Sequence, residues 1–223
     1  MKKHLLPALL LAALLTASCS TTGTAQSCKS ALTPLQRVAC AGDTKNVLWL
    51  LDNGAAIDDT DRDGWTALMF AARSGHTDTA RLLLDKGANL HATDAARWTP
   101  LMLAAKRGHT STARLLLDRG ANVNAVTKYG GTALVSAASG GHTATARLLL
   151  DRGASMDATG SKNGWTPLMF AAWNGHADTV RLLLDRGADP NVTGKDGSTA
   201  LSLAQRGEHT AVMDMLRAAG AKK

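Results

Sequence analysis

One short pattern recurs along the chain at a nearly fixed interval, and this repetition limits the possible folds more than any other feature. The leucine of a Thr-x-Leu triplet returns after steps of 33, 33, 33, 34 and 33 residues. A unit of this length is too small to bury its apolar face alone, so successive units must stack into one continuous core. The six leucines are Leu35, Leu68, Leu101, Leu134, Leu168 and Leu201.

Every unit has the same internal order. A turn such as residues 61–64 precedes a segment like "TALMFAA", which predicts a short helix with Pro100 or Pro167 in its first turn. A glycine break follows, and then a second helix, predicted over residues 80–86 and ended by Gly87. The one longer step adds a residue between Gly153 and Gly164, where we expect a loop. The pattern predicts an all-α solenoid of stacked helix pairs.

The repeated residues resemble the ankyrin repeat family. Thr-Ala/Pro-Leu, Ala-Ala, Gly-His, Leu-Leu-Leu and Gly-Ala recur at this period over about residues 32–221. The resemblance implies helix-turn-helix units joined by β-hairpin-like loops, with a concave surface that holds partner proteins. The family's histidine after Thr-Pro-Leu is replaced, for example by Met69. The six units are residues 32–60, 61–93, 94–126, 127–160, 161–193 and 194–223.

The first and last units depart from the pattern. The first has Cys40 and Asp43 and lacks Gly-His, while the last has Glu208 at a glycine position and Arg217 at a leucine position. These departures are typical of capping repeats, whose outer faces must contact water.

The first 18 residues predict a secretory signal peptide, because a basic start is followed by an apolar run and small residues. The letters LTASC, which end at Cys19, resemble a bacterial lipobox and imply a lipid on Cys19. Ser20 resembles the pattern of lipoproteins sent to an outer membrane. Residues 19–31 then form a polar linker, and the lipid anchors the chain without spanning the bilayer. The alternative is cleavage after Ala25, which releases a soluble periplasmic protein.

Export makes the two remaining cysteines candidates for a disulfide. A bond between Cys28 and Cys40 closes a loop of 13 residues and stabilises the fold by about 3 kcal/mol in the chain-entropy model. The alternative is two free thiols. A function of a different class also depends on this pair: an envelope protein that handles redox equivalents or metal through Cys28 and Cys40.

Most charged and metal-ligating residues recur once per unit, which favours a role in the repeat itself. The column of five histidines that contains His76 cannot converge on one metal ion, because stacked helices lie about 8–10 Å apart. Arg81 precedes Asp85 by four residues, and this spacing, which recurs in the second to fifth units, predicts a pair on one helical face. Trp49 is predicted to lie in the core.

No catalytic motif appears in the sequence: it lacks a G-x-S-x-G elbow, a phosphate-binding loop and an H-E-x-x-H pair. The formal charge of +7 is mostly periodic, which disfavours nucleic-acid binding. We therefore expect no enzyme, no cofactor and no small-molecule substrate.

When the repeats are aligned, each set of equivalent positions forms a column. The columns in which the repeats differ are the candidate binding site. They fall at the loop tips and at the ends of the first helices, which line the concave surface in the family that this chain resembles. Tryptophan and arginine often dominate protein interfaces, so these columns predict contact with a partner protein. The alternative for the loop tryptophans is a scaffold role that covers the adjacent loop. The candidates are Trp65, Arg73, Trp98, Lys106, Arg107, Tyr129, Trp165 and Trp173.

The sequence therefore predicts an exported, lipid-anchored scaffold that binds another protein. An inhibitor or immunity protein that captures a toxin or hydrolase in the envelope fits this prediction, and so does a stress-related adaptor.

Overall fold

The computed structural model describes residues 32–160 and 162–222, which include all six repeats. The predicted signal peptide, the lipid attachment at Cys19, the linker and Cys28 lie outside the described residues. Among the residues that are described, no helix is long and apolar enough to cross a membrane.

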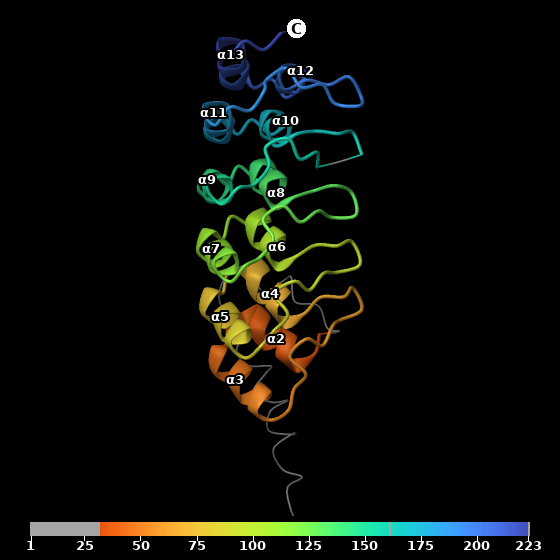
Figure 1. Cartoon of the computed structure of the whole chain (residues 1–223), viewed down its shortest axis with the longest axis vertical. Coiled ribbons are helices and arrows are strands. Elements are labelled where there is room, and N and C mark those ends of the chain that lie inside the picture. Colours follow the sequence, from red (N-terminus) through yellow and green to blue (C-terminus); the bar gives the residue numbers. More distant parts are fainter. Residues whose placement is uncertain (1–31, 161, 223) are drawn as a thin grey trace, which may run out of the picture.

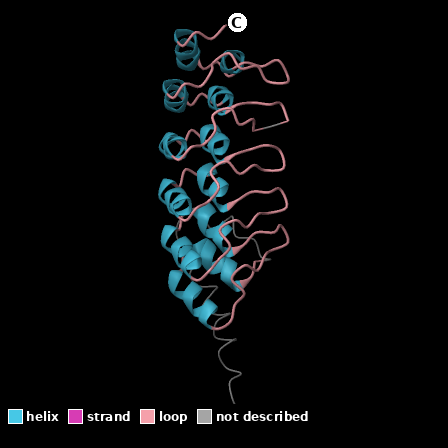
Figure 2. Ribbon diagram, viewed as in Figure 1, coloured by secondary structure: helices cyan, strands magenta, loops and turns pink. Residues whose placement is uncertain are grey.

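The described chain is a stack of helix pairs in two layers, with the loops projecting to one side (Figures 1 and 2). Neighbouring first helices pack on one another along the stack, and each second helix packs on the first helix of its own repeat. The predicted all-α solenoid is confirmed. The first helices are α2 (Pro34–Ala41), α4 (Ala67–Ser74), α6 (Pro100–Lys106), α8 (Ala133–Ser139), α10 (Pro167–Trp173) and α12 (Ala200–Arg206). The second helices are α3 (Thr44–Asp52), α5 (Thr77–Asp85), α7 (Thr110–Asp118), α9 (Thr143–Asp151), α11 (Ala177–Asp185) and α13 (Thr210–Ala218).

Local capping fixes where the helices begin. Each first helix starts after a threonine whose hydroxyl accepts a hydrogen bond from the third helical N–H, as Thr99 does from Met102. Pro100 and Pro167 occupy the first turn as predicted. The second helix of residues 61–93 begins at Thr77, one turn before the predicted start at Ala80, because the left-handed Gly75 turns the chain directly into it.

The loops between repeats are hairpin-like, as predicted, and the described residues contain no strand. Each loop is closed by a backbone hydrogen bond between its two arms, such as Asp61 N–H to the Trp65 carbonyl at 3.1 Å. The equivalent bond in the fifth repeat joins Gly160 to Trp165 and spans one residue more. The extra residue of the longer step therefore lies in a loop, as predicted.

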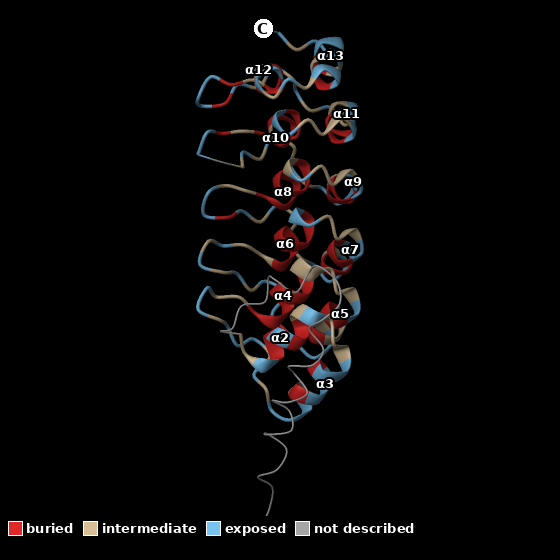
Figure 3. Ribbon diagram, turned by 180° about the vertical axis from the view of Figure 1, so that it is seen from behind, coloured by how far each residue is buried: buried red, intermediate tan, exposed pale blue. Residues whose placement is uncertain are grey.

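The core lies between the two helix layers and continues through the stack (Figure 3). Leu68, Leu134 and Met69 are fully buried on the first helices. The prediction that Trp49 lies in the core is wrong, because its side chain is 41% exposed. In α3 the buried positions are Val47 and Leu50, and Trp49 lies on a different side of the helix.

The histidine column joins each repeat to the preceding one. His109 Nε2 lies 3.0 Å from the Arg73 carbonyl, and His142 Nε2 lies 3.1 Å from the Lys106 carbonyl. The same contact recurs in every described repeat that has the histidine. Burial, more than the charges of its neighbours, lowers the pKa of His109. These contacts confirm the structural role predicted for the column.

A second polar column was not predicted from the sequence. Threonine hydroxyls at the starts of adjacent second helices form hydrogen bonds, as Thr77 does with Thr112 at 2.8 Å and Thr110 with Thr145 at 2.7 Å. These bonds satisfy half-buried hydroxyls within the stack and help to fix the register of one repeat on the next.

The predicted ion pairs within each second helix are wrong. Among the described residues, the aspartate of one repeat pairs with the cation of the next, as Asp85 does with Arg119 and Asp118 with Arg152, both at 2.8 Å. The cation just past the end of a second helix, such as Arg119 at the C-cap of α7, bonds to the aspartate of the preceding repeat. Because these pairs are largely exposed, each contributes less than about 1 kcal/mol.

Replacing Glu208 with glycine is expected to stabilise the last repeat. Glu208 has φ of +57°, at the position where earlier repeats have glycines such as Gly175 at +72°. The left-handed conformation costs a non-glycine residue about 1–2 kcal/mol, so Glu208→Gly should raise the free energy of unfolding by about 1 kcal/mol. Urea unfolding followed by far-UV circular dichroism measures the change.

The matched control is the reverse substitution, Gly175→Ala. Its new Cβ would lie 2.5 Å from the His209 ring at a left-handed position, so this variant should be less stable than the wild type. A Glu208→Gly variant with unchanged or lower stability would contradict the assignment of backbone strain.

Candidate functional site

The eight predicted site residues lie on one side of the stack, where the loops meet the first helices. We call this surface the loop-side face and define it by these residues. Contacts connect them in sequence along the stack: Trp98 and Lys106 border two neighbouring clefts, and Phe170 links the second cleft to Trp165. The face consists of Trp65, Arg73, Trp98, Lys106, Arg107, Tyr129, Trp165 and Trp173.

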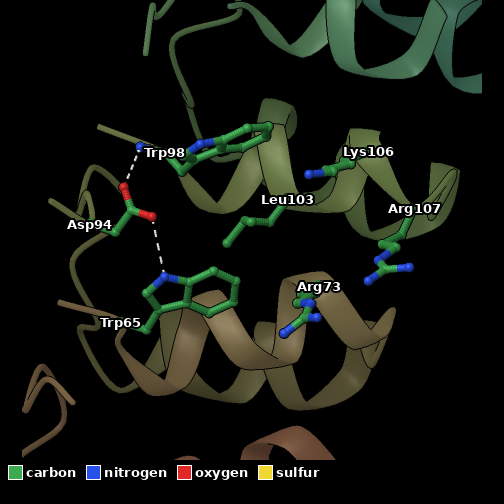
Figure 4. A pocket seen from close by; sticks show the side chains of 7 residues that line it. All are labelled: Trp65, Arg73, Asp94, Trp98, Leu103, Lys106 and Arg107. Atoms are coloured by element: carbon green, nitrogen blue, oxygen red, sulfur yellow. Dashed lines mark hydrogen bonds between the residues drawn. The ribbon is translucent and has the colours of Figure 1, made fainter. Parts of the chain in front are cut away.

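The first cleft lies between the second and third repeats and has a volume of about 230 Å³. Figure 4 shows Trp65 and Trp98 on its two sides with Asp94 at one end. Leu103 of α6 lies at its centre, and three cationic side chains, from α4, α6 and the C-cap of α6, lie toward the opposite end. We call it the basic cleft.

Asp94 holds the two tryptophans of this cleft in place. One carboxylate oxygen accepts a hydrogen bond from the Trp65 indole N–H at 3.2 Å. The other accepts the backbone N–H groups of Ala96 and Trp98 at 2.9 and 2.8 Å. The Trp65 ring also packs on Phe70, with a centroid distance of 5.2 Å. Trp65 therefore links two loops, as its scaffold interpretation predicts, while one side of its ring borders the cleft.

Two cations of the basic cleft lie over the rings of its tryptophans. Arg73 lies 5.3 Å from the centre of the Trp65 ring, and Lys106 Nζ lies 4.8 Å from that of Trp98. Among the described residues, no ion pair includes Arg73, Lys106 or Arg107. Burial, and secondly the charge of Arg107, lowers the pKa of Arg73. The cleft therefore concentrates positive charge against a single carboxylate that already accepts three hydrogen bonds.

The second cleft is larger, about 420 Å³, and lies over the fourth repeat. This repeat has small residues where its neighbours have large ones. Gly131 occupies the column of Trp65, Trp98 and Trp165, and Ser136 occupies the column of Phe70, Leu103 and Phe170. The cleft is bordered by Tyr129, Val135 and Phe170. We call it the apolar cleft.

At the far end of the face, Trp165 and Trp173 form an aromatic pair with a centroid distance of 5.8 Å. The indole N–H of Trp165 donates to Asp196 in the next loop at 3.1 Å. Trp173 is 40% exposed, whereas its counterparts in other repeats are polar or small. Trp165 therefore supports the loop and positions the exposed ring of Trp173.

The site residues thus divide into two groups. Trp65 and Trp165 have scaffold contacts, while Tyr129, at 55% exposure, and Trp173 present aromatic surface to solvent. The sequence variation at Gly131 and Ser136 could have indicated the apolar cleft, because two small residues replace bulky ones in the same repeat. The alignment of the repeats shows both small residues. Whether together they leave a cleft depends on how the loop packs against α8.

Cys40 lies at the end of α2 and is disulfide-bonded. Its sequence-predicted partner Cys28 is outside the described residues, so that pairing stays a prediction. Within the described part of the chain, no group of three histidine, cysteine or acidic side chains is placed to hold a metal ion.

Comparison with known families agrees with the repeat pattern. Models for ankyrin repeats in three copies match residues 8–94 and 89–160, and a model for ankyrin repeats in many copies matches residues 149–204. No curated protein matches the chain. Because these matches cover most of its length and the structure shows the stacked helix pairs, the chain belongs to the ankyrin repeat family.

Proposed function

We propose that this protein is a non-enzymatic scaffold that binds a partner protein through its loop-side face. Ankyrin repeats suggest a protein–protein interaction scaffold, and the family assignment therefore gives the general class. The proposal adds which surface binds the partner. That surface is formed by the columns in which the repeats differ, and not by the columns that they share.

The observation that carries this proposal is the distribution of exposed aromatic and unpaired cationic side chains. Tyr129 and Trp173 are exposed on the loop-side face, and Arg73, Lys106 and Arg107 lie there without ion pairs among the described residues. Aromatic residues and arginine contribute most to binding energy in protein interfaces. The shared columns, by contrast, are occupied by contacts between repeats.

We also propose that the scaffold works at the periplasmic side of a bacterial envelope, anchored to the outer membrane by a lipid on Cys19. The support is the sequence alone: a basic, apolar leader ending in LTASC. The twelve linker residues after Cys19 (20–31) reach at most roughly 40 Å, which keeps the repeats close to the membrane surface. An inhibitor of an envelope hydrolase or a stress-related adaptor fits this placement.

Replacing Trp173 with alanine is expected to reduce partner capture by about tenfold or more. The exposed ring contributes contact area to a partner, and truncation of an aromatic interface residue commonly costs about 2 kcal/mol or more. Capture is measured by chemical crosslinking in intact cells that produce the chain, followed by quantification of the retained partner. Circular dichroism checks that the helix content is unchanged.

Trp49→Ala is the matched control, because Trp49 has nearly the same exposed fraction, 41%, but lies on a second helix away from the loop-side face. This variant should capture the partner as the wild type does. Equal capture by wild type and Trp173→Ala, or an equal loss in both variants, would show that the loop-side face is not the binding surface.

A further inference from the structure

The loop-side face has two neighbouring clefts of different chemistry, which share Trp98 and Lys106. The basic cleft contains Arg73, Lys106 and Arg107, and the apolar cleft is bordered by Tyr129 and Phe170. Identical repeats would present the same surface at every position along the stack. The difference in chemistry between the two clefts therefore comes from the few columns in which the repeats differ.

The charge of the basic cleft selects an acidic group. Its three cations face one carboxylate, and Asp94 is already occupied by the indole of Trp65 and by two backbone N–H groups (Figure 4). Partial burial, and secondly the charge of Arg107, disfavours the charged form of Arg73, and an incoming carboxylate would offset both effects. Arg73 and Arg107 can also bind a carboxylate with two parallel hydrogen bonds.

The apolar cleft has space for a side chain that the protein itself supplies in other repeats. Gly131 leaves open the position that Trp98 fills one repeat earlier, and Ser136 replaces Leu103. Ser136 Oγ donates to the Thr132 carbonyl at 2.9 Å, so its hydroxyl is not directed at a ligand. An aromatic or aliphatic side chain from a partner would occupy the volume of about 420 Å³ between Tyr129 and Phe170.

The spacing of the clefts sets the spacing of the ligand. The clefts adjoin at the third repeat, whose Trp98 and Lys106 border both of them, so they are about one repeat apart. Packed helices lie about 8–10 Å apart. An extended chain advances about 3.3–3.6 Å per residue, so the distance corresponds to about three residues.

We propose that the two clefts together bind an extended segment of the partner protein that carries an aspartate or glutamate and, about three residues away, an aromatic or large aliphatic residue. This inference rests on the proposed function, because it names the chemistry of the segment that the loop-side face recognises. The acidic residue lies in the basic cleft, and the apolar residue lies in the space above Gly131.

The test is selection of random dodecapeptides displayed on phage against the full chain. The wild type is expected to enrich peptides in which an acidic and an apolar residue are about three positions apart. A synthetic peptide from the enriched set then gives dissociation constants by fluorescence anisotropy. A labelled single-stranded oligonucleotide is the second probe and should not compete with the peptide at physiological ionic strength.

Two variants separate the contributions of the clefts. Combined Arg73→Gln, Lys106→Gln and Arg107→Gln should remove the acidic preference and keep the apolar one. Gly131→Trp should remove the apolar preference and keep the acidic one, because it fills the cleft with the tryptophan that other repeats have at this position. The backbone of Gly131 is outside the left-handed region, so it can accept a side chain. Ser136→Leu fills the same space and replaces Gly131→Trp if that variant misfolds. Each change is expected to raise the dissociation constant of the enriched peptide by about tenfold.

Three results would overturn this inference: selection without the acidic and apolar pair, peptide affinity unchanged by both variants, or displacement of the peptide by the oligonucleotide. These outcomes are distinguishable from failure of the proposed function. If the Trp173→Ala variant loses partner capture while the selected peptides lack the pair, the face binds a partner and only the ligand chemistry is wrong.

Discussion

Leu134→Ala is expected to lower the free energy of unfolding by about 2–5 kcal/mol, the range for a leucine truncated in a well-packed core. Leu134 is fully buried on α8, in the middle of the stack. Helix α8 packs against α6 on one side and α10 on the other, so the cavity weakens two interfaces between repeats. Urea unfolding should show a shift of the whole transition to lower denaturant concentration.

Leu201→Ala provides the comparison, because Leu201 is the equivalent residue of the last repeat and is equally buried. Helix α12 packs against α10 and α13, and the part of the chain that the structure describes contains no further repeat beyond it. In a stack stabilised by nearest-neighbour contacts, this change should unfold the last repeat locally and leave the others protected. Amide hydrogen exchange measures this. Equal loss of protection throughout the chain in both variants would contradict the nearest-neighbour account of stability.

The repeat pattern was sufficient to predict the fold because residues at equivalent positions have the same packing environment in every unit. Leu68 and Leu134 occupy the same column and the same buried environment, so their spacing specifies both the element and its place in the core. Helix starts were predicted where a residue has a strong local effect, as Pro100 has. They were misplaced where a turn decided the start, as at Thr77.

Contacts between repeats were harder to predict, because sequence separation does not show which neighbour a side chain reaches. Asp85 was expected to pair with Arg81 along its own helix, yet its partner in the structure is Arg119. The hydroxyl pair of Thr77 and Thr112 also depends on the register of two stacked helices. Trp49, on the second helix of the first unit, was predicted to lie in the core, but in α3 Val47 and Leu50 occupy the buried positions and Trp49 is 41% exposed.

The candidate site was predicted from the columns that vary, and its role in binding stays a prediction. Trp173 stood out because its counterparts are polar or small, and the structure places it at 40% exposure beside Trp165. The sequence could not show that Trp65 donates to Asp94, nor that Gly131 and Ser136 together leave a cleft. Both features depend on the distance between adjacent loops.

The second large effect is expected in the yield of crosslinked partner when a photoreactive residue is placed at two different positions of the third repeat. Placed at Arg107, at the end of α6 in the basic cleft, it should crosslink strongly to the partner because that position lies within the proposed interface. Placed at Arg114, on α7 of the same repeat, it should crosslink at least about tenfold less, because residues outside an interface remain solvated. Both side chains are exposed, so neither substitution should disturb the fold.

This comparison tests the central claim most directly, because it asks which side of the stack contacts the partner in the cell. The measurement is the yield of crosslinked partner from each position, identified by mass spectrometry and normalised to the amount of chain. The account predicts a crosslinked partner from Arg107 and little or none from Arg114. Equal yields at the two positions, or a greater yield from Arg114, would contradict binding through the loop-side face.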